Sequence, residues 1–593
     1  MCGFFGFSGS PGPLVEKARA ALHELRHRGP DQWGEWWDDR VYLGHHRLSI
    51  LDLSEHGRQP MKDREGQVHI AVNGEIYGFQ RWRRELSGKH EFQSLSDSEV
   101  VLHGYKEWGL RGLLDRIDGI YAFCIYDQRL NKVFLVRDRA GVKPLYFARI
   151  QNQFAWASEL KALRAFFGPD RLTPDVTALY DFLTYLYVPA PKSLYRDVYK
   201  LEPAHYAELD LATGTFTKNA YWTLNKTPVA ISESEAAGHL AELVDRSVQE
   251  QLVSDVPVGV FLSGGMDSSI VASSAVRYSR HIQTFNIRID DPRLDESGYA
   301  QVVADHLGTD HHVRDCGRED AGQWVDRIQA WYDEPFADTS AIPTHLVSRF
   351  SRERITVALS GDGGDELFGG YQWYWWMKER ADAGRPRWPG LRPWSARLKR
   401  RVGRGLLGRA VRRMEFDYVL GELEVYTRLM GGLIRDDKLR YARAWGVDPD
   451  YDDYWYFRQH WDPDLPLLTR LQVLDFHTYL PDDILTKVDR ASMQVALEVR
   501  VPLLSRAIIE FVFSLPEPVR YAGGILKGLL KKAFNDRLPP AILTRRKQGF
   551  SIPLQAWNMA DTAGLPSIQE RILSRDYAHV LPPLAKPTAP GAA

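Results

Sequence analysis

The apolar and polar positions of the first 210 residues follow the pattern of short β-strands. Runs rich in Val, Ile, Phe and Tyr are separated by turn signals such as Asn73-Gly74 and Gly141. Helix-like patterns occupy 15–26 and 99–108, and Ser96-Asp97-Ser98-Glu99 predicts an N-cap with an acidic first turn. The predicted strands are 68–72, 122–126, 132–137, 144–149 and 154–157. Many strands with few long helices predict an α+β domain with two stacked antiparallel sheets and flanking helices.

Beyond residue 210 the pattern changes to helices that alternate with short apolar runs. An amphipathic helix is predicted at 232–253, a buried strand at 257–262 and another helix at 270–277. Further strands are predicted at 284–287 and 355–359. Such alternation is typical of an α/β domain with a parallel sheet. The end of the chain is rich in Pro and Ala, so we expect domains at 1–210 and 211–560, followed by a partly disordered tail at 561–593.

Length and composition exclude several classes of protein. A chain of 593 residues is too long for one hydrophobic core, since domains average roughly 100–200 residues. A net charge of −1, with 44% hydrophobic and 26% charged residues, describes a globular chain and argues against a nucleic-acid partner. The sequence shows no basic opening followed by an apolar stretch and no apolar run of about 18 residues. We therefore expect a cytoplasmic protein with no membrane partner, and a homodimer is one assembly that the sequence leaves open.

The three cysteines, Cys2, Cys124 and Cys316, are too few and too scattered for a disulfide framework or a zinc site. Cys124 lies inside a predicted strand and is expected to be buried. Cys2 has a different context, because Met1 is expected to be removed before such a small residue. Its thiol and a free α-amine, with a reference pKa near ~8, then share one residue and the amine can take the thiol proton. The alternative is a buried small residue that opens a strand.

Polar clusters in the first domain contain the groups needed to bind an amino acid beside a thiol. An arginine offers a bidentate fork to an α-carboxylate, and Glu75 and Asp97 can hold an α-ammonium. The Asn73 side chain and the Gly74 backbone N–H can stabilise the oxyanion of a tetrahedral intermediate. Each cluster alone also fits turn chemistry. The clusters are Arg28-Gly29-Pro30-Asp31, 45–50, 73–77 and 94–99.

Two glycine-rich loops follow buried strands in the second domain. Ser263-Gly264-Gly265-Met266-Asp267-Ser268-Ser269 joins a strand to a helix, where free N–H groups and the helix dipole favour a phosphate. Asp267 can hold Mg²⁺ against phosphate oxygens, and the loop lacks the lysine of a Walker A motif. The second loop, 360–371, is acidic; the alternative is a turn-rich loop without a ligand.

The first domain resembles a class II glutamine amidotransferase domain, which belongs to the N-terminal-nucleophile hydrolases. The resemblance rests on the N-terminal Cys-Gly and on Arg-Gly-Pro-Asp, His-Arg-Leu-Ser-Ile-Leu-Asp, Asn-Gly-Glu-Ile-Tyr and Ser-Asp-Ser-Glu, in the order found in glutamine-hydrolysing asparagine synthetases. It implies that Cys2 attacks the glutamine amide, forms a thioester and releases ammonia. Asn73 and Gly74 are implied as the oxyanion hole. The implied glutamine-binding residues are Arg47, Asn73, Gly74, Glu75 and Asp97.

The second domain resembles the ATP pyrophosphatases, which cleave ATP to AMP and pyrophosphate while they adenylate a substrate. The resemblance implies Asp267 and Asp365 as Mg²⁺ ligands and Asp362 as the acidic group that assists ammonia attack. It implies Lys527 as the cation that neutralises charge at the α-phosphate; the alternative is a solvated lysine like Lys531 or Lys532. The implied ATP-contacting residues are Leu262, Ser263, Gly264, Gly265, Asp267, Ser268, Ile287, Ser360 and Gly361.

Three later segments carry less specific patterns. Residues 479–490 and 498–503 resemble a further signature of the family, which we interpret mainly as architecture between the domains. Residues 378–413 are rich in Arg with interspersed Pro and Trp. Basic residues interleaved with aromatics can bind nucleic acid, but a solvated helical face or a variable insertion is the commoner explanation. We favour an anionic acceptor or a subunit contact over nucleic acid there.

The sequence therefore predicts a glutamine- and ATP-dependent amide synthetase with small-molecule partners. Glutamine, ATP with Mg²⁺, and a carboxylate acceptor are its expected substrates and cofactors, and ammonia is expected to pass through an internal tunnel. L-Aspartate, which gives L-asparagine, is the leading acceptor. Because 334–344 contains no obvious clamp for the aspartate α-carboxylate, a sugar-acid or natural-product carboxylate stays open. A glutamine-independent ligase is disfavoured by Cys2, Arg47 and Asp97, and a catalytically silent scaffold is the alternative of another class.

Overall fold

The computed structural model describes residues 2–317, 327–402, 405–545, 548–549, 568–579 and 581. Met1, whose removal the proposed nucleophile requires, lies outside the described residues. The expected tail is described only in part, and that part forms a helix, α25 (Ile568–Asp576), whose Ile572 and Leu573 are buried in a core shared with α5 (Val176–Tyr185). No described helix is long and apolar enough to cross a membrane.

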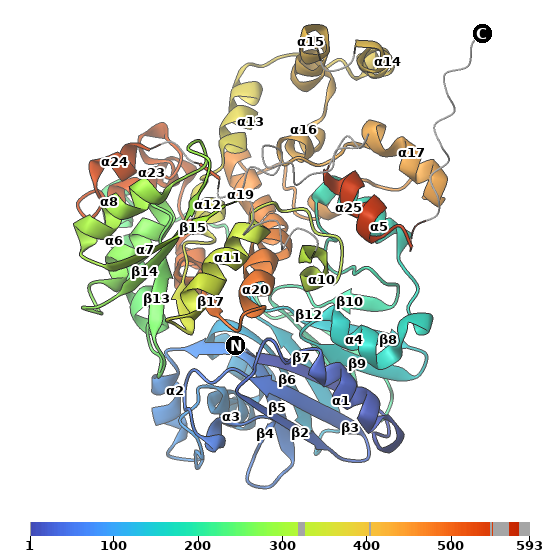
Figure 1. The fold of residues 1–593 in the computed structure, drawn as a ribbon, viewed down its shortest axis with the longest axis vertical. Helices are drawn as coiled ribbons and strands as arrows, with labels where there is room; N and C mark the ends of the chain where they lie inside the picture. Colours follow the sequence, from blue (N-terminus) through green and yellow to red (C-terminus); the bar gives the residue numbers. More distant parts are fainter. Residues whose placement is uncertain are drawn as a thin grey trace.

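Two six-stranded antiparallel sheets form the first domain, as the strand pattern predicts (Figure 1). Phe4 of β1 lies between the sheets against Trp156 and Cys124, whereas Phe5 and Phe7 face α1 (Val15–His23) and α4 (Leu160–Phe167), so the side chains alternate as in any strand. The second sheet is covered by α2 (Phe79–Leu86) and α3 (Ser98–Arg116). The strand order of the first sheet is β10 (Val198–Lys200), β8 (Tyr146–Ile150), β9 (Gln153–Ala157), β1 (Cys2–Ser8), β3 (Val41–Arg47) and β2 (Gln32–Trp37). The strand order of the second sheet is β12 (Phe216–Ala220), β11 (His205–Asp210), β7 (Lys132–Arg137), β6 (Asp118–Asp127), β5 (Val68–Tyr77) and β4 (Met61–Lys62).

The turn predicted at Asn73-Gly74 is wrong, because β5 continues through it as far as Tyr77. Asn73 pairs with Ala122 and Gly74 with Tyr121 of β6 in an unbroken antiparallel register. A side chain at Gly74 would lie 2.0 Å from the Ile120 carbonyl oxygen, and its φ of +142° is one that only glycine adopts easily. Gly74 therefore allows β5 and β6 to approach closely, and the chain does not reverse its direction there.

A five-stranded parallel sheet forms the centre of the second domain, which confirms the predicted α/β architecture. Its order is β15 (Asp310–Cys316), β14 (Gln283–Ile289), β13 (Val258–Phe261), β16 (Val357–Leu359) and β17 (Glu498–Arg500). The chain moves outward from β13 in one direction to β15 and in the other to β17. The loops that leave β13 and β16 are thus neighbours at the point where the strand order reverses, the usual ligand position in open α/β sheets.

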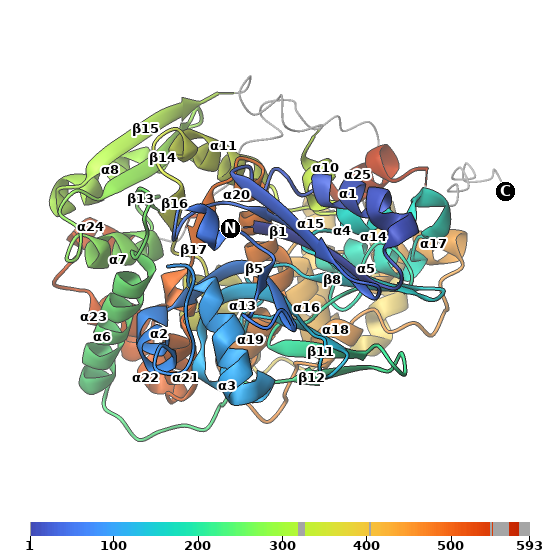
Figure 2. The ribbon, with the colours of Figure 1, turned by 90° about the horizontal axis from the view of Figure 1, so that it is seen from below.

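Helices surround this sheet and extend the second domain (Figures 1 and 2). A capping box begins α6, since Ser232 and Glu235 bond reciprocally. The helices are α6 (Glu233–Gln251), α7 (Met266–Ala275), α8 (Ser297–Leu307), α10 (Ile328–Tyr332), α11 (Ala341–Arg352), α12 (Gly364–Phe368), α13 (Gln372–Asp382), α14 (Arg392–Val402), α15 (Leu406–Met414), α16 (Glu422–Leu429), α17 (Arg435–Trp445), α18 (Trp455–Arg458), α19 (Leu467–His477), α20 (Thr486–Met493), α21 (Arg506–Phe513), α22 (Glu517–Arg520), α23 (Gly528–Ala533) and α24 (Pro540–Thr544).

The expected boundary at residue 210 falls inside the hairpin of β11 and β12. Since β12 pairs with β11 along its whole length, the first domain's sheet extends to Ala220. We propose a boundary between β12 and α6. In Figure 1 the antiparallel sheets lie below, the parallel sheet lies above and to the side, and α20 stands between them.

Candidate active site

Cys2 is the first residue of β1 and lies opposite Arg47 of β3. It is 6% exposed, and burial raises the pKa of its thiol. The backbone N–H of Cys2 donates to Asn73 Oδ1 at 3.0 Å. Because β1 and β5 belong to different sheets, this bond joins the two sheets at the predicted nucleophile. A thiol with a raised pKa needs a base nearby to become a thiolate.

Asn73 lies beside Cys2, and Gly74 follows it in β5. The Asn73 side chain is fully buried, with Oδ1 used by Cys2. Its Nδ2 has no hydrogen-bond partner among the residues that the structure describes. A buried donor left without a partner costs about 1–3 kcal/mol, so this N–H₂ group is suited to a ligand oxygen.

Arg47 is also close to Cys2, but its guanidinium is engaged within its own loop. Nη1 donates to Gln32 Oε1 at 2.7 Å and to the Ser54 carbonyl at 3.2 Å, and Nη2 donates to the Leu51 and Asp52 carbonyls. To bind an α-carboxylate as predicted, the Arg47 guanidinium therefore has to give up a hydrogen bond to at least one of these carbonyls.

Glu75 and Asp97 are two buried carboxyl groups at the other side of the candidate pocket. Burial and the Asp97 charge raise the pKa of Glu75 well above its usual range, and burial raises the pKa of Asp97. Asp97 occupies the cap position of α3, but its side chain does not cap the helix as predicted. Its Oδ2 accepts instead from the Ile76 N–H of β5 at 2.6 Å. A ligand ammonium would stabilise both charged forms.

Arg500, a residue of the second domain from a segment expected mainly to be architecture between the domains, also contacts this group of residues. Arg500 of β17 is 1% exposed; its Nη2 lies 3.2 Å from Glu75 Oε1 and its Nε 2.5 Å from Glu498 Oε1. Its Nη1 donates to the Gln251 and Val253 carbonyls. The sequence does contain a signal for this contact: Glu498 and Arg500 are two charges in a short strand, and buried charges are normally paired.

The loop after β13 has the geometry of a phosphate cradle at the start of α7. Gly264 has a φ of +71°, and a Cβ there would lie 2.4 Å from the Ala300 backbone nitrogen. Ser263 and Ser268 contact each other through their hydroxyls at 3.1 Å, which closes the loop. Arg545, which the sequence analysis did not single out, donates to the Gly264 carbonyl at 3.1 Å. Leu262, which directly follows β13, and Ile287 of the neighbouring strand β14 are both buried.

The second loop brings Asp365 to Asp267 of the first. The ideal Cβ of Gly364 would lie 2.6 Å from Asp267 Cγ, so glycine lets the two loops touch. Lys527 lies between the carboxylates, 2.5 Å from Asp365 Oδ1 and in contact with Asp267 Oδ2. Burial alone would lower the pKa of Lys527, but the two carboxylates outweigh it and raise that pKa. Lys527 is thus a buried, paired cation and not a solvated lysine.

Asp267 and Asp365 also fit the expected Mg²⁺. Among the described ranges, no three His, Cys, Asp or Glu side chains converge as an all-protein metal site requires. Mg²⁺ is commonly held by one or two carboxylates together with substrate phosphates. Two carboxylates from two loops that meet at a phosphate cradle supply that donor set.

Asp362 stands next to this centre, with its Oδ2 accepting from Ser360 Oγ at 2.6 Å. Gly361 between them packs against the backbone of Asp267 and Ser268. Facing this loop, Lys487 of α20 forms a 3.0 Å ion pair with Asp338 of the predicted acceptor segment. The structure therefore brings the predicted nucleotide and acceptor residues of the second domain to one place.

The same helix, α20, reaches Cys2 through a buried ionic cluster that was not predicted from the sequence. Arg28 Nε donates to the Cys2 carbonyl at 2.9 Å, while Nη1 and Nη2 donate to Asp489 at 2.7 and 3.0 Å. Arg490 pairs with Glu159 at 2.6 Å. Lys143, Lys161 and Asp333 complete the cluster. Charges at Asp489 and Arg490 in a buried helix were its signal in the sequence.

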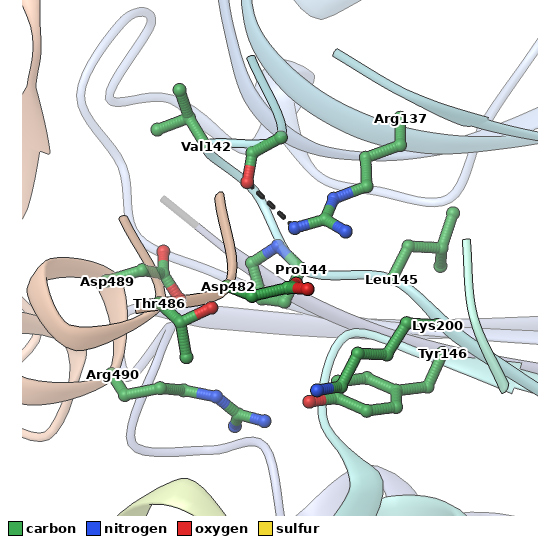
Figure 3. A pocket seen from close by; sticks show the side chains of 11 residues that line it. Arg137, Val142, Pro144, Leu145, Tyr146, Lys200, Asp482, Thr486, Asp489 and Arg490 are labelled. Carbon is green, nitrogen blue, oxygen red and sulfur yellow. Dashed lines mark hydrogen bonds between the residues drawn. The ribbon is translucent and has the colours of Figure 1, made fainter. Parts of the chain in front are cut away.

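A small cavity lies beside this cluster at the domain interface (Figure 3). Lys200, Tyr146 and Leu145 line it from the first domain, and Thr486, Asp489 and Arg490 line it from α20. Its free volume of about 10 Å³ accepts one molecule of the size of water.

The Arg28–Asp489 contact yields a stability prediction. Asp489→Asn removes the carboxylate that pairs with both Arg28 and Lys143, and leaves Glu159 as the remaining ion-pair partner of Arg28. Losing one partner of a buried ion pair costs about 3–5 kcal/mol. We expect calorimetry to show a clearly lower Tm. The matched control, Asp315→Asn, breaks the exposed 3.0 Å pair with Arg288 and should change Tm little. Equal Tm values for both variants would contradict a structural role of the cluster.

Comparisons with known proteins match both halves of the chain. The family model for the glutamine amidotransferase domain matches residues 1–222, and the model for asparagine synthase matches residues 239–586. A glutamine-hydrolysing asparagine synthetase 1 of Bacillus subtilis is 31% identical over 570 residues, across 94% of this chain and 88% of that protein. A putative glutamine-hydrolysing asparagine synthetase of Mycobacterium tuberculosis is 30% identical, with the same two coverages of 94% and 88%. Amidase chry2 of Gibberella zeae is 32% identical over 63% of this chain and 59% of its own length.

Proposed function

Because the chain belongs to the asparagine synthase family, we propose that it is a glutamine- and ATP-dependent amide synthetase with L-aspartate as its leading acceptor. The observation that carries this proposal is the position of β17 and α20. Both elements belong to the second domain, and both contact groups around Cys2 in the first. A thiol site and a nucleotide site are thus built together within one chain, as a coupled transfer of nitrogen requires. We propose the cytoplasm as the location of this reaction, because ATP and glutamine are soluble substrates.

The thiol half of the reaction is glutamine hydrolysis. After loss of Met1, the α-amine of Cys2 takes the thiol proton, and the thiolate sulfur attacks the side-chain amide carbon. Asn73 Nδ2 and the Gly74 N–H donate to the oxyanion as it forms. As the intermediate collapses to a thioester, its amide nitrogen takes that proton back from the α-ammonium of Cys2 and leaves as ammonia. Water then hydrolyses the thioester to glutamate.

The nucleotide half activates the acceptor. A carboxylate oxygen attacks the α-phosphorus of ATP in line with the departing pyrophosphate, which gives an acyl-adenylate. Asp267 and Asp365 would hold Mg²⁺, which would neutralise negative charge at the pyrophosphate. Lys527 pairs with these carboxylates, and its ammonium turns to the phosphate oxygens as their negative charge develops. Leu262, Ser263, Gly264, Gly265, Ser268, Ile287, Ser360 and Gly361 form the nucleotide pocket.

Ammonia then attacks the acyl carbon, and AMP leaves. Asp362 accepts the proton that the nitrogen loses, with Ser360 holding its carboxylate in place. Ammonia has to remain unprotonated on its way, since ammonium is not a nucleophile. We place its route along the interface, where the cavity beside α20 admits one molecule of the size of water, and hence one of ammonia.

Aspartate is the leading acceptor, and the charges near the acceptor segment define the alternatives. Asp338 already neutralises Lys487, and burial and the Asp338 charge raise the pKa of Asp483 well above its usual range. This environment suits an acceptor that carries an ammonium group, as aspartate does. It supplies no spare arginine in the acceptor segment 334–344 for a second carboxylate. An amino-bearing sugar acid or natural-product carboxylate is therefore the second candidate.

Product analysis tests the proposal. With glutamine, ATP and Mg²⁺, we expect AMP, pyrophosphate and asparagine in equal amounts only when aspartate is added. Glutamate formation without aspartate-dependent pyrophosphate would assign the enzyme to another carboxylate. Absence of nucleotide turnover with every carboxylate offered would contradict the synthetase and favour the scaffold.

A further inference from the structure

The helices α13, α14 and α15 form a protrusion on the second domain, far from the antiparallel sheets (Figure 1). α13 leaves the acidic loop directly after Tyr371 and leads outward, and α14 and α15 stand at its outer end. The protrusion contains no residue that the proposed reaction uses. We propose that it is a docking surface for the face of an anionic lipid membrane.

Exposed apolar side chains gather on this protrusion. Seven of the twenty large apolar residues that are clearly exposed in the described chain lie between 375 and 407, and such clustering marks an interaction site. The largest exposed fractions are 79% for Leu406, 62% for Leu407 and 55% for Trp394. The other members are Trp375, Trp376, Trp388 and Leu391.

Positive charge coincides with this apolar surface. Residues 383–414 contain eleven Lys and Arg and no Asp or Glu. Since the whole chain carries −1, the remainder carries −12. Arg385, Arg392 and Arg413 pair with acidic residues at the base of the protrusion. Arg397 and Arg409 are exposed and form no ion pair with any residue within the described ranges.

This combination fits a membrane surface better than other anionic partners. Cations near a charged leaflet contribute about 1 kcal/mol each, and Trp side chains prefer the level of the lipid headgroups. Adjacent exposed leucines insert favourably below the headgroups, whereas a nucleic-acid backbone offers them no apolar contact. The expectation of no membrane partner rested on the lack of a spanning segment, which surface attachment does not require.

Vesicle sedimentation with the full-length protein tests the proposal. We expect binding to vesicles that contain about 30% phosphatidylglycerol in phosphatidylcholine, with a large loss in high salt, because exposed charges are screened. Vesicles of phosphatidylcholine alone should bind at least tenfold more weakly. Leu406→Ser with Leu407→Ser, and separately Arg397→Glu with Arg409→Glu, should each weaken binding to anionic vesicles at least tenfold.

The matched control replaces two exposed leucines of the first domain, Leu53 and Leu130, each 53% exposed, by serine. It should bind like the unmodified protein. Failure to bind anionic vesicles, or binding that neither salt nor the paired variants reduce, would overturn the proposal. A different result would also overturn it: the unmodified protein binds no vesicles but self-associates in sedimentation velocity, and the leucine variant does not. The exposed face would then join two copies of the chain. Unchanged ammonia-dependent synthesis in each variant shows that it has folded.

Discussion

Cys2→Ala is expected to lower glutamine-dependent synthesis by at least about 1,000-fold, because removal of a catalytic nucleophile costs several orders of magnitude. Synthesis from ammonium chloride should stay within about twofold, since the nucleotide site lies in the other domain and keeps all of its groups. The measurement is asparagine formed per minute with each nitrogen donor, together with glutamate release. The two rates separate the thiol chemistry from the ligase chemistry in one protein.

Cys124→Ala is the matched control for this variant. Cys124 is fully buried in β6, as the sequence predicts, and lies among apolar side chains. Its replacement should cost some stability but leave the ratio of glutamine to ammonia use unchanged. Two results would contradict a nucleophile confined to the first domain. One is loss of both glutamine-dependent and ammonia-dependent synthesis in Cys2→Ala, and the other is a changed ratio of the two rates in Cys124→Ala.

Lys527→Met is expected to lower synthesis by about 100- to 1,000-fold with glutamine and with ammonia alike, the usual effect of losing one group that stabilises transition-state charge. Met keeps the length of the side chain but removes the cation between Asp267 and Asp365. The two carboxylates then repel each other and the phosphates. Pyrophosphate release measured with either nitrogen donor, alongside glutamine hydrolysis without ATP, should show that only the ligase step is lost.

Lys531→Met provides the control, because Lys531 follows Lys527 by one helical turn and forms no ion pair within the described chain. Its rates should remain within about twofold of the unmodified protein. If Lys527→Met keeps full pyrophosphate release, Lys527 only compensates the buried carboxylates and takes no part in adenylation.

Local pattern was sufficient to predict the two fold classes. The strand at 132–137 agrees with β7 at both ends, and the helix expected at 232–253 corresponds to α6 at 233–251. Periodicity and caps are properties of neighbouring residues, so a single sequence reports them well. Asn73-Gly74 and Asp97 were exceptions. A turn signal cannot be distinguished from a glycine that a close strand contact requires, and the Asp97 side chain accepts from Ile76 of β5 instead of capping α3.

The contacts between the domains could not be predicted in this way. Arg28 meets Asp489, and Glu75 meets Arg500, across more than four hundred residues of chain. Nothing near Arg28 in the sequence indicates its partner, since pairing depends on how two finished sheets and a helix dock. For the same reason, the engagement of Arg47 by carbonyls of its own loop became visible only with the loop in place.

Arg500 lies late in the chain, so the ribosome makes the residues around Cys2 long before it makes the arginine that pairs with Glu75. A ribosome completes both antiparallel sheets well before it reaches β17, and at about 5–20 residues per second the interval is on the order of tens of seconds. During that interval Glu75 lacks its arginine and Arg28 lacks Asp489. A nascent or prematurely terminated chain therefore carries the thiol in an unfinished pocket. We therefore expect glutamine hydrolysis only once the same polypeptide also holds the second domain, which would use its nitrogen.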